Sequence, residues 1–396
     1  MESEPGRGNL IVTLKGKKGD GFNLMIIGHI DVVPIQSRWS VDAFQGVEKD
    51  GYICGRGAID DKGQIAAMVY LAILLKRINL DFKGSVRLFM VADEEIQNPK
   101  HGMRFLVKNR RDLFKGINGG IGELGGVIKL RNKKNQIVVF GEKGALSLRI
   151  TIYGDKGHGS QIYRVKNSVL GLAKFLVGSP NEYFFISKPT RIMLKNLIGR
   201  KSLLLSNKLL NNIIISMLYR RDPKLAKIIH ALTHITIAKT VLKAGQAENV
   251  FPEEAKAELD IRLFPENNKD KIISDMKKYV PKGYKHKIEV KSFIPPTYSS
   301  LNTPLFLAIE KTVMEMGYRP LPIFQTGSSD SAWVRKIGIP VYHFMTTTRE
   351  IEMDRIHGTD ERIWKEDLIK IVEGYWRLIK NLSNPSFYNY KPYSVL

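Results

Sequence analysis

Strand-like and helical patterns alternate through the first 140 residues, and this alternation limits the fold more than any other feature of the sequence. Residues 23–27 and 85–91 form short apolar runs that are typical of buried strands. Between them, residues 63–76 place apolar side chains on one wide face at helical spacing. A strand, a helix and a second strand in this order indicate a layered α/β domain, so we expect a mixed sheet flanked by helices.

The pattern changes in the middle of the chain. Strand and helical patterns follow one another there in the order β-α-β-β-α-β, at residues 146–153, 167–177, 235–242, 256–263, 269–279 and 286–290. This order is that of a ferredoxin-like α+β domain. Helical patterns at 304–316 and 365–382 then return to the first type of domain. We therefore predict an α/β domain in two parts, 1–143 and 294–396, interrupted by an α+β domain at 144–293.

The net charge of +23 is concentrated in one segment. Residues 188–243 contain 12 Lys and Arg against a single acid, Asp222. A strongly basic chain suits nucleic acid, an acidic membrane surface or anionic substrates. The sequence lacks the stacking-aromatic motifs and zinc fingers of common nucleic-acid readers, so we expect no nucleic-acid partner. A basic protein that binds nucleic acid or a membrane surface stays as an alternative of another class.

A basic insert at about 180–234 interrupts the predicted α+β domain. Its residues 194–219 are apolar and punctuated by Lys, Arg and Asn. One interpretation is a basic amphipathic helix that lies on a membrane surface. The interpretation that we favour is a buried dimer contact or a lid over the substrate.

Cysteine content and hydropathy restrict the kind of metal site and the compartment. Cys54 is the only cysteine, so any metal must be bound by His, Asp and Glu. No apolar run reaches the roughly 20 residues of a membrane-spanning helix, and the N-terminus lacks the apolar stretch of a signal peptide. We therefore expect a cytoplasmic location.

Acidic residues and histidines stand at strand ends and in loops, where an α/β scaffold places its active site. They are His29 with Asp31, Asp60 with Asp61, Glu94 with Glu95, Glu123, and His357 with Asp360. Imidazole nitrogens and carboxylate oxygens bind divalent cations, and one carboxylate can bridge two ions. A role as a helix cap would explain one residue of the pair Asp60 and Asp61, but it would not explain the glycines on both sides of the pair. Adjacent glutamates at a strand end point in different directions, so one can bind metal while the other acts as a base.

Eight stretches that contain these residues resemble a family of dinuclear zinc metallopeptidases. The family includes carboxypeptidase S, aminoacylase, acetylornithine deacetylase and succinyl-diaminopimelate desuccinylase. The stretches, in family order, are GHIDVVP (28–34), GRGAIDDKG (55–63), DEE (93–95), GELGG (122–126), GEKGALSLRITIYGDKGHGS (141–160), ENVFPEEAKAELDIR (248–262), GSSDSAW (327–333) and RIHGTDERI (355–363). The GELGG form most resembles the carboxypeptidase S branch.

The resemblance implies two zinc ions, with cobalt or manganese able to occupy the same ligands. Asp60 would bridge the two ions, with His29 and Glu123 completing one site and Glu95 and His357 the other. The peptide bond that follows Asp60 would be cis. The two parts of the α/β domain would form the catalytic domain, and the α+β domain would be a lid and dimerisation domain.

The resemblance also implies roles for five further residues. Glu94 would be the general base, and Asp31 would orient the histidine ligand. His158 would stabilise the oxyanion in a neighbouring subunit, which implies a homodimer. Asn249 and Arg262 would hold the carboxylate of the substrate, which suits the bidentate fork of a guanidinium.

The expected function is that of a metallohydrolase that cleaves the amide bond of peptides or N-acyl amino acids with a free carboxylate. The alternative within this class is a biosynthetic deacylase that acts on acetylornithine or succinyl-diaminopimelate. Family members usually place a helix and a strand before the segment that matches residues 6–12. We therefore expect that a longer natural form exists.

Overall fold

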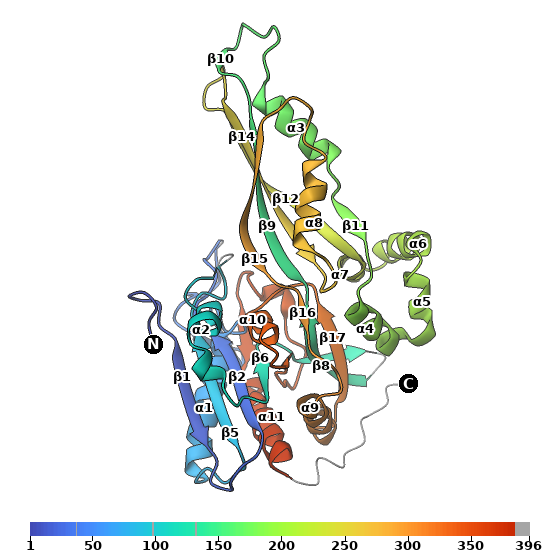
Figure 1. Ribbon diagram of the computed structural model, residues 1–396. Coiled ribbons are helices and arrows are strands. Elements are labelled where there is room, and N and C mark those ends of the chain that lie inside the picture. Colours follow the sequence, from blue (N-terminus) through green and yellow to red (C-terminus); the bar gives the residue numbers. More distant parts are fainter. Residues whose placement is uncertain (37, 97–98, 131–132, 385–396) are drawn as a thin grey trace. The chain divides into compact units, whose positions relative to one another are not determined.

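The computed structural model describes residues 1–36, 38–96, 99–130 and 133–384. By its internal contacts the chain divides into two compact units (Figure 1). Unit 1 contains Met1–Gly141, Tyr298–Phe324 and the chain from Ser329 onward, and unit 2 contains Glu142–Thr297 and Gln325–Ser328. Each unit is described by itself.

Unit 1 is built on a nine-stranded mixed sheet. Its main path runs β1 (Leu10–Lys15), β5 (Ser85–Val91), β2 (Asn23–His29), β6 (Gly119–Gly122), β18 (Val341–His343), β8 (Lys133–Glu142) and β16 (Thr297–Tyr298), while β7 (Val127–Leu130) and β17 (Arg319–Gln325) also pair with β8. The central strands β5, β2, β6 and β18 are parallel to one another, whereas β1 runs antiparallel to β5 and β8 runs antiparallel to β18. The carboxyl ends of the parallel strands therefore meet at one edge of the sheet.

Helices cover this sheet, as the alternating pattern predicts. They are α1 (Lys62–Arg77), α2 (Met103–Asn109), α9 (Pro304–Glu315), α10 (Ser331–Lys336) and α11 (Lys365–Ser383). The buried face of α1 includes Ala67, Met68, Leu71 and Leu75, and α11 packs against both α1 and α9. The predicted mixed sheet flanked by helices is thus confirmed.

A second, three-stranded sheet in unit 1 joins distant parts of the chain. It consists of β3 (Val47–Lys49), β4 (Tyr52–Cys54) and β19 (Arg362–Trp364), with β4 in the middle. The short 3-10 helices η1 (Arg111–Phe114) and η3 (Met353–Arg355) complete unit 1. Because β19 pairs with β4, the segment before α1 is held next to the segment that follows residue 355.

Unit 2 contains a five-stranded antiparallel sheet. The strand order is β11 (Glu182–Phe184), β12 (His234–Ala244), β14 (Glu254–Leu263), β9 (Gly144–Tyr153) and β15 (His286–Ile294). Alternate side chains of β14 are buried, and α3 (Ser168–Gly178) packs on β9 and β14. With α8 (Lys269–Lys277), the main elements β9, α3, β12, β14, α8 and β15 follow the expected β-α-β-β-α-β order. A two-stranded sheet of β10 (Gly157–His158) and β13 (Val250–Phe251) is added to them.

The basic insert is a chain of short helices. They are α4 (Lys188–Ile198), η2 (Gly199–Lys201), α5 (Ser202–Leu205), α6 (Lys208–Tyr219) and α7 (Pro223–Thr233). The interpretation of residues 194–219 as one amphipathic helix is therefore wrong. Gly199 has a positive φ of 60°, which ends α4, and the side chain of Asn207 caps a new helix by accepting hydrogen bonds from the N–H groups of Leu209 and Leu210.

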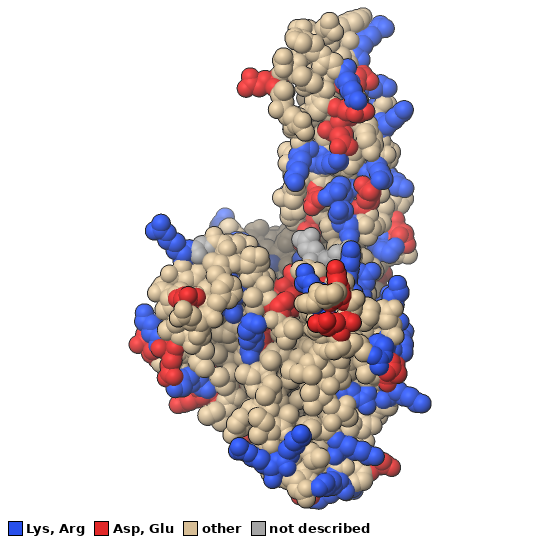
Figure 2. Space-filling model, turned by 90° about the vertical axis from the view of Figure 1, so that its left-hand side faces the viewer, with Lys and Arg blue, Asp and Glu red and all other residues tan. Residues whose placement is uncertain are grey.

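The charges of the chain are mixed outside this insert. On the face shown in Figure 2, blue Lys and Arg side chains alternate with red Asp and Glu side chains on both units. The described residues of that face form no continuous basic stripe of the kind that follows a nucleic-acid backbone. In the described part of the chain, no helix is both long enough and apolar enough to cross a membrane.

Candidate metal centre

The acidic residues and histidines singled out in unit 1 converge at the carboxyl ends of its parallel strands. His29 ends β2, Glu94 and Glu95 follow β5, and Glu123 follows β6. These three strands are neighbours in the sheet, with β2 between β5 and β6. The order of the strands therefore brings together residues that lie up to about one hundred positions apart.

Asp60 is the residue that connects the two halves of this group. Its Oδ1 lies 2.9 Å from Nε2 of His29, and its Oδ2 lies 3.3 Å from Nε2 of His357. The same nitrogen of His29 is 3.4 Å from Oε2 of Glu123, and that of His357 is 3.0 Å from Oε2 of Glu95. Two sets of ligand atoms thus share a single carboxylate. The peptide bond between Asp60 and Asp61 is cis, which confirms the expectation for this bond.

The electrostatics of the group favour bound positive charge. Burial raises the pKa of Glu94 and of Glu123 well above the usual range, and neighbouring carboxylates raise both further. Hydrogen bonds to Asp60 and Glu95 raise the pKa of His357 to about 10. The buried Oδ1 of Asp61 has no hydrogen-bond partner among the described residues. Such a donor set of carboxylates and imidazoles, without a thiolate, fits divalent cations.

Asp31 acts mainly through the strand end that carries the two glutamates. Its two carboxylate oxygens accept the backbone N–H groups of Glu94 and Glu95, at 3.2 and 3.0 Å. Nδ1 of His29 lies 3.0 Å from the backbone oxygen of Asp31 and 3.7 Å from its carboxylate. The main chain of Asp31 therefore fixes the imidazole, while its side chain fixes the neighbouring glutamates.

Glu361 is a residue of the site that the sequence reasoning missed. Its Oε1 accepts the N–H groups of Ile59 and Asp60, at 2.9 and 3.0 Å. Its Oε2 accepts the N–H of Gly57 at 3.0 Å and the guanidinium of Arg56 at 2.8 Å. Both charged side chains are buried. Glu361 lies in the stretch RIHGTDERI and Arg56 in the stretch GRGAIDDKG, both of which resemble the family, and this was the signal in the sequence that could have pointed to them.

Asp360, which the sequence groups with His357, has a different contact. Its Oδ1 accepts the backbone N–H of Ser40 at 2.8 Å. Its carboxylate therefore holds a loop of unit 1, and within this pair it is His357 that faces Asp60 and Glu95.

The predicted residues of the α+β domain all lie in unit 2. His158, on β10, is exposed, and its Nδ1 lies 2.8 Å from Oγ of Ser160. Asn249 is also exposed, and its backbone oxygen accepts the N–H of Gly159 at 2.6 Å. Arg262, on β14, forms an ion pair with Asp260 through Nε and Nη2, at 2.8 and 2.9 Å. Unit 2 thus brings His158 and Asn249 together, and it pairs the predicted carboxylate-binding arginine with a neighbouring acid.

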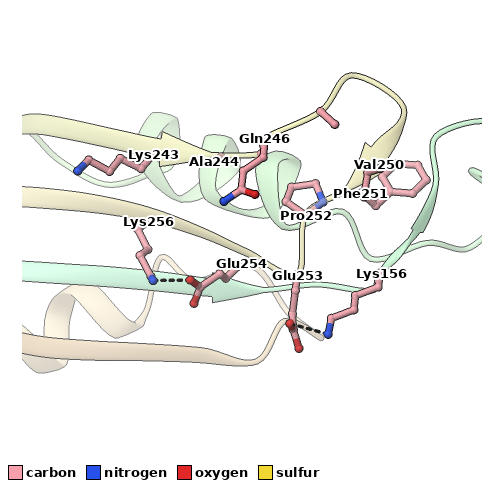
Figure 3. A pocket seen from close by; sticks show the side chains of 12 residues that line it. Lys156, Lys243, Ala244, Gln246, Val250, Phe251, Pro252, Glu253, Glu254 and Lys256 are labelled. Carbon is pink, nitrogen blue, oxygen red and sulfur yellow. Dashed lines mark hydrogen bonds and ion pairs between the residues drawn. The ribbon is translucent and has the colours of Figure 1, made fainter.

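A cavity of about 640 Å³ lies at the end of unit 2 that carries β13. Figure 3 shows two ion pairs in its lining, Lys156 with Glu253 at 2.8 Å and Lys256 with Glu254, and a further charged side chain, Lys243. Among its described lining residues are none of the predicted substrate-binding or catalytic side chains. Four of the five charged side chains of this lining thus pair with one another.

One further group of possible metal ligands lies in unit 2. Ligand atoms of Glu182, His230 and His234 are within 4.8 Å of one another. Nε2 of His230 is 2.7 Å from Oε2 of Glu182, and the two imidazole rings stack at 4.2 Å. An ion pair and a ring stack explain these contacts without a cation.

Comparison with known proteins agrees with the geometry of unit 1. Residues 25–381 match the profile described as peptidase family M20/M25/M40. The chain is 28% identical over 382 residues to an N-fatty-acyl-amino acid synthase/hydrolase PM20D1 of Xenopus tropicalis, covering 92% of this chain and 74% of that protein. It is 26% identical over 394 residues to a probable carboxypeptidase S-like 2 of Dictyostelium discoideum, covering 94% and 74%.

Solved structures give the same result for the fold. The structure of an M20 family metallo-carboxypeptidase, Sso-CP2 of Sulfolobus solfataricus, superposes with a TM-score of 0.72 at 22% identity. The superposition covers 94% of this chain and 87% of that protein. The family resemblance carried by the sequence motifs is confirmed, and the chain is an enzyme of a metal-dependent class. The chain belongs to peptidase family M20/M25/M40.

Proposed function

We propose that this enzyme hydrolyses the amide bond of peptides or N-acyl amino acids that carry a free carboxylate, with two divalent cations in the centre of unit 1. The observation that carries the proposal is the position of Asp60, whose two oxygens face two different histidines. The names of the similar proteins, an N-fatty-acyl-amino acid synthase/hydrolase and a probable carboxypeptidase, support substrates of this class.

The donor set divides into two groups around the shared carboxylate. His29, Asp60 and Glu123 would hold one cation, and Asp60, Glu95 and His357 would hold the other. We propose zinc, while cobalt or manganese suit the same ligands. When bound, a pair of such cations lowers the pKa of water and polarises the carbonyl of the scissile amide.

Glu94 is the proposed general base. Burial raises its pKa well above the usual range, and a raised pKa is a common feature of carboxyl groups that transfer protons in active sites. Its backbone N–H donates to the carboxylate of Asp31, and this hydrogen bond fixes the backbone from which the Glu94 side chain extends. Glu94 would accept a proton from the attacking water and would then donate a proton to the leaving nitrogen.

Residues of unit 2 would complete the site. His158 would stabilise the oxyanion in the active site of a partner subunit, which makes a homodimer the functional form. Asn249 and Arg262 would bind the carboxylate of the substrate. The ion pair of Arg262 with Asp260 uses the N–H of Nε and one N–H of Nη2, so the two N–H groups of Nη1 and the second N–H of Nη2 would serve this contact.

A substrate panel with metal-free and zinc-reloaded protein tests the proposal. The panel contains dipeptides, N-fatty-acyl amino acids, and the N-acetyl and N-succinyl substrates of a biosynthetic deacylase. We expect turnover only after zinc is restored, and only on substrates with a free carboxylate. Blocking that carboxylate as an amide is the matched control. Equal turnover of blocked and free substrates would contradict the proposal, and turnover of the short acyl substrates alone would favour the deacylase.

A further inference from the structure

The insert of unit 2 leaves an apolar face uncovered. In α6, all of whose residues the structure describes, the only fully buried side chain is the polar Asn211. Leu209, Leu210, Ile213 and Met217 are 69, 39, 47 and 61% exposed. At about 100° per residue these four side chains form one stripe on the side of the helix away from Asn211. The helix therefore turns the polar Asn211 inward, while these four apolar side chains face outward.

The helix before α6, which contacts it, also exposes apolar side chains. Leu203 and Leu204 of α5 are exposed, while Leu205 is buried. Met193 and Leu194 of α4 are buried as well. The exposed leucines of α5 thus differ from these buried neighbours in the same insert. We name the exposed apolar side chains of the two helices the α5–α6 face, which consists of Leu203, Leu204, Leu209, Leu210, Ile213 and Met217. Exposed apolar groups that gather in this way mark an interaction site.

The surroundings of the α5–α6 face are basic. Residues 188–233 contain ten Lys and Arg and one acid, Asp222. That acid caps α7, where its carboxylate accepts the N–H of Leu225 at 3.0 Å. Lys201, Lys208 and Arg220 are exposed at the ends of α5 and α6. A partner that complements this surface would offer apolar groups to the α5–α6 face and negative charges to the Lys and Arg around it.

We propose that the α5–α6 face docks on an anionic lipid surface. Its apolar side chains would enter the acyl region, and the Lys and Arg of the surrounding insert would lie among the headgroups. Long basic side chains suit this position because their stems remain in contact with apolar groups while the charge reaches the headgroups. A second copy of the chain fits the same face less well. A twofold-symmetric contact centred there would bring the same basic residues of both copies together, and Asp222 is the one acid that residues 188–233 offer to compensate them. The inference does not depend on the substrate of the enzyme.

Vesicle co-sedimentation of the purified chain tests this inference. We expect binding to vesicles of phosphatidylcholine with phosphatidylglycerol, weak binding to phosphatidylcholine alone, and release from the anionic vesicles as salt is raised. The triple variant Lys208→Glu, Arg220→Glu and Arg221→Glu should lower the partition coefficient on the order of a hundredfold. Its control, with the same change in charge, is Lys115→Glu, Lys282→Glu and Lys291→Glu.

A second variant tests the apolar side chains. Leu209→Gln, Ile213→Gln and Met217→Gln together should reduce binding about tenfold or more, because each loses apolar area that enters the bilayer. The control is Val69→Gln, Ile73→Gln and Ile369→Gln, which changes exposed apolar side chains on α1 and α11 of unit 1. Circular dichroism and melting temperature confirm folding of each variant.

Three results would overturn the inference. One is equal binding by the unaltered chain and the Leu209, Ile213 and Met217 variant. Another is binding that ignores both lipid charge and salt. The third is a dimer in sedimentation velocity that the same variant dissociates, together with no binding to anionic vesicles, because the face would then be a contact between two copies.

Discussion

The candidate metal centre of unit 1 has an excess of acidic residues in a largely buried space, whereas the basic insert of unit 2, which carries the α5–α6 face, has an excess of basic residues at the surface. The centre gathers six carboxylates, those of Asp31, Asp60, Asp61, Glu94, Glu95 and Glu123, around two histidines in a largely buried space. The insert that carries the α5–α6 face places ten cationic side chains and one acid at the surface.

The difference determines what kind of partner each region needs. Buried like charges cost free energy that solvent does not screen, so the centre requires counter-ions bound at fixed positions and in fixed number. Exposed like charges are already solvated, so the insert requires only a diffuse anionic surface, and salt should weaken its binding. A change of one side chain should therefore have large effects in the first region and graded effects in the second.

The largest effect is expected from Glu94→Gln. This variant removes the proposed base and leaves the donor set of Asp60 intact, so turnover should fall about a thousandfold or more while bound metal is retained. Steady-state kinetics and metal analysis of the same sample measure both quantities. The adjacent Glu95→Gln is the matched variant, and it should lose metal together with activity. If the two variants lose metal equally, the division of roles between the neighbouring glutamates is wrong.

The next effect concerns the buried pair that holds the loop before α1. Glu361→Gln leaves the guanidinium of Arg56 buried without its counter-charge, so the free energy of unfolding should fall by about 3 to 5 kcal/mol. Urea denaturation monitored by fluorescence gives this value. Glu352→Gln is the control, because the pairs of Glu352 with Arg355 and Arg362 are partly exposed, and it should cost about 1 kcal/mol or less. Similar losses in the two variants would show that burial does not set the cost of an unpaired charge here.

Unit 2 also contains a buried basic side chain, that of Lys143. Lys143 is fully buried and donates to the backbone oxygens of Ala231 and His234, and burial lowers its pKa to about 7. The unfolded chain, whose lysines titrate near pH 10.4, binds more protons than the folded chain between about pH 7 and pH 10. The free energy of unfolding should therefore rise with pH over this range, by up to about 1.4 kcal/mol per unit, relative to Lys143→Met.

Urea denaturation at pH 6.5, 8 and 9.5 measures this dependence on the unaltered chain and on Lys143→Met. Lys239→Met is the control, because Lys239 is less buried and should show a weaker dependence. A constant difference between the unaltered chain and Lys143→Met across the three pH values would mean that Lys143 keeps its charge in the folded protein.

Local signals in the sequence were sufficient for most elements of the fold. The predicted strand at 85–91 is β5. The predicted helix at 304–316 is α9, which ends one residue earlier. Its start was predictable because Thr303 caps the helix and a proline occupies its first turn. In the insert, the apolar content of residues 194–219 suggested one helix, although Gly199 and Asn207 carry the signals that divide it.

The candidate site was predictable where residue type alone limits the chemistry. Histidines and acids that follow strands pointed to the donor set, and the parallel order of β5, β2 and β6 brings them together. Glu361 could not be assigned in this way, because its role depends on hydrogen bonds to a loop some 300 positions earlier in the chain. For the same reason the sequence did not show that the carboxylate of Asp31 binds the backbone of Glu94 and Glu95.

The number of zinc ions bound per chain shows whether the carboxylate of Asp60 is shared between two metal sites. After reloading with zinc and removal of excess, elemental analysis should find two ions per chain. Glu123→Gln and His357→Asn should each retain about one, whereas Asp60→Asn should weaken both sites together. A single ion in the unaltered chain, or two ions retained in Asp60→Asn, would contradict the account.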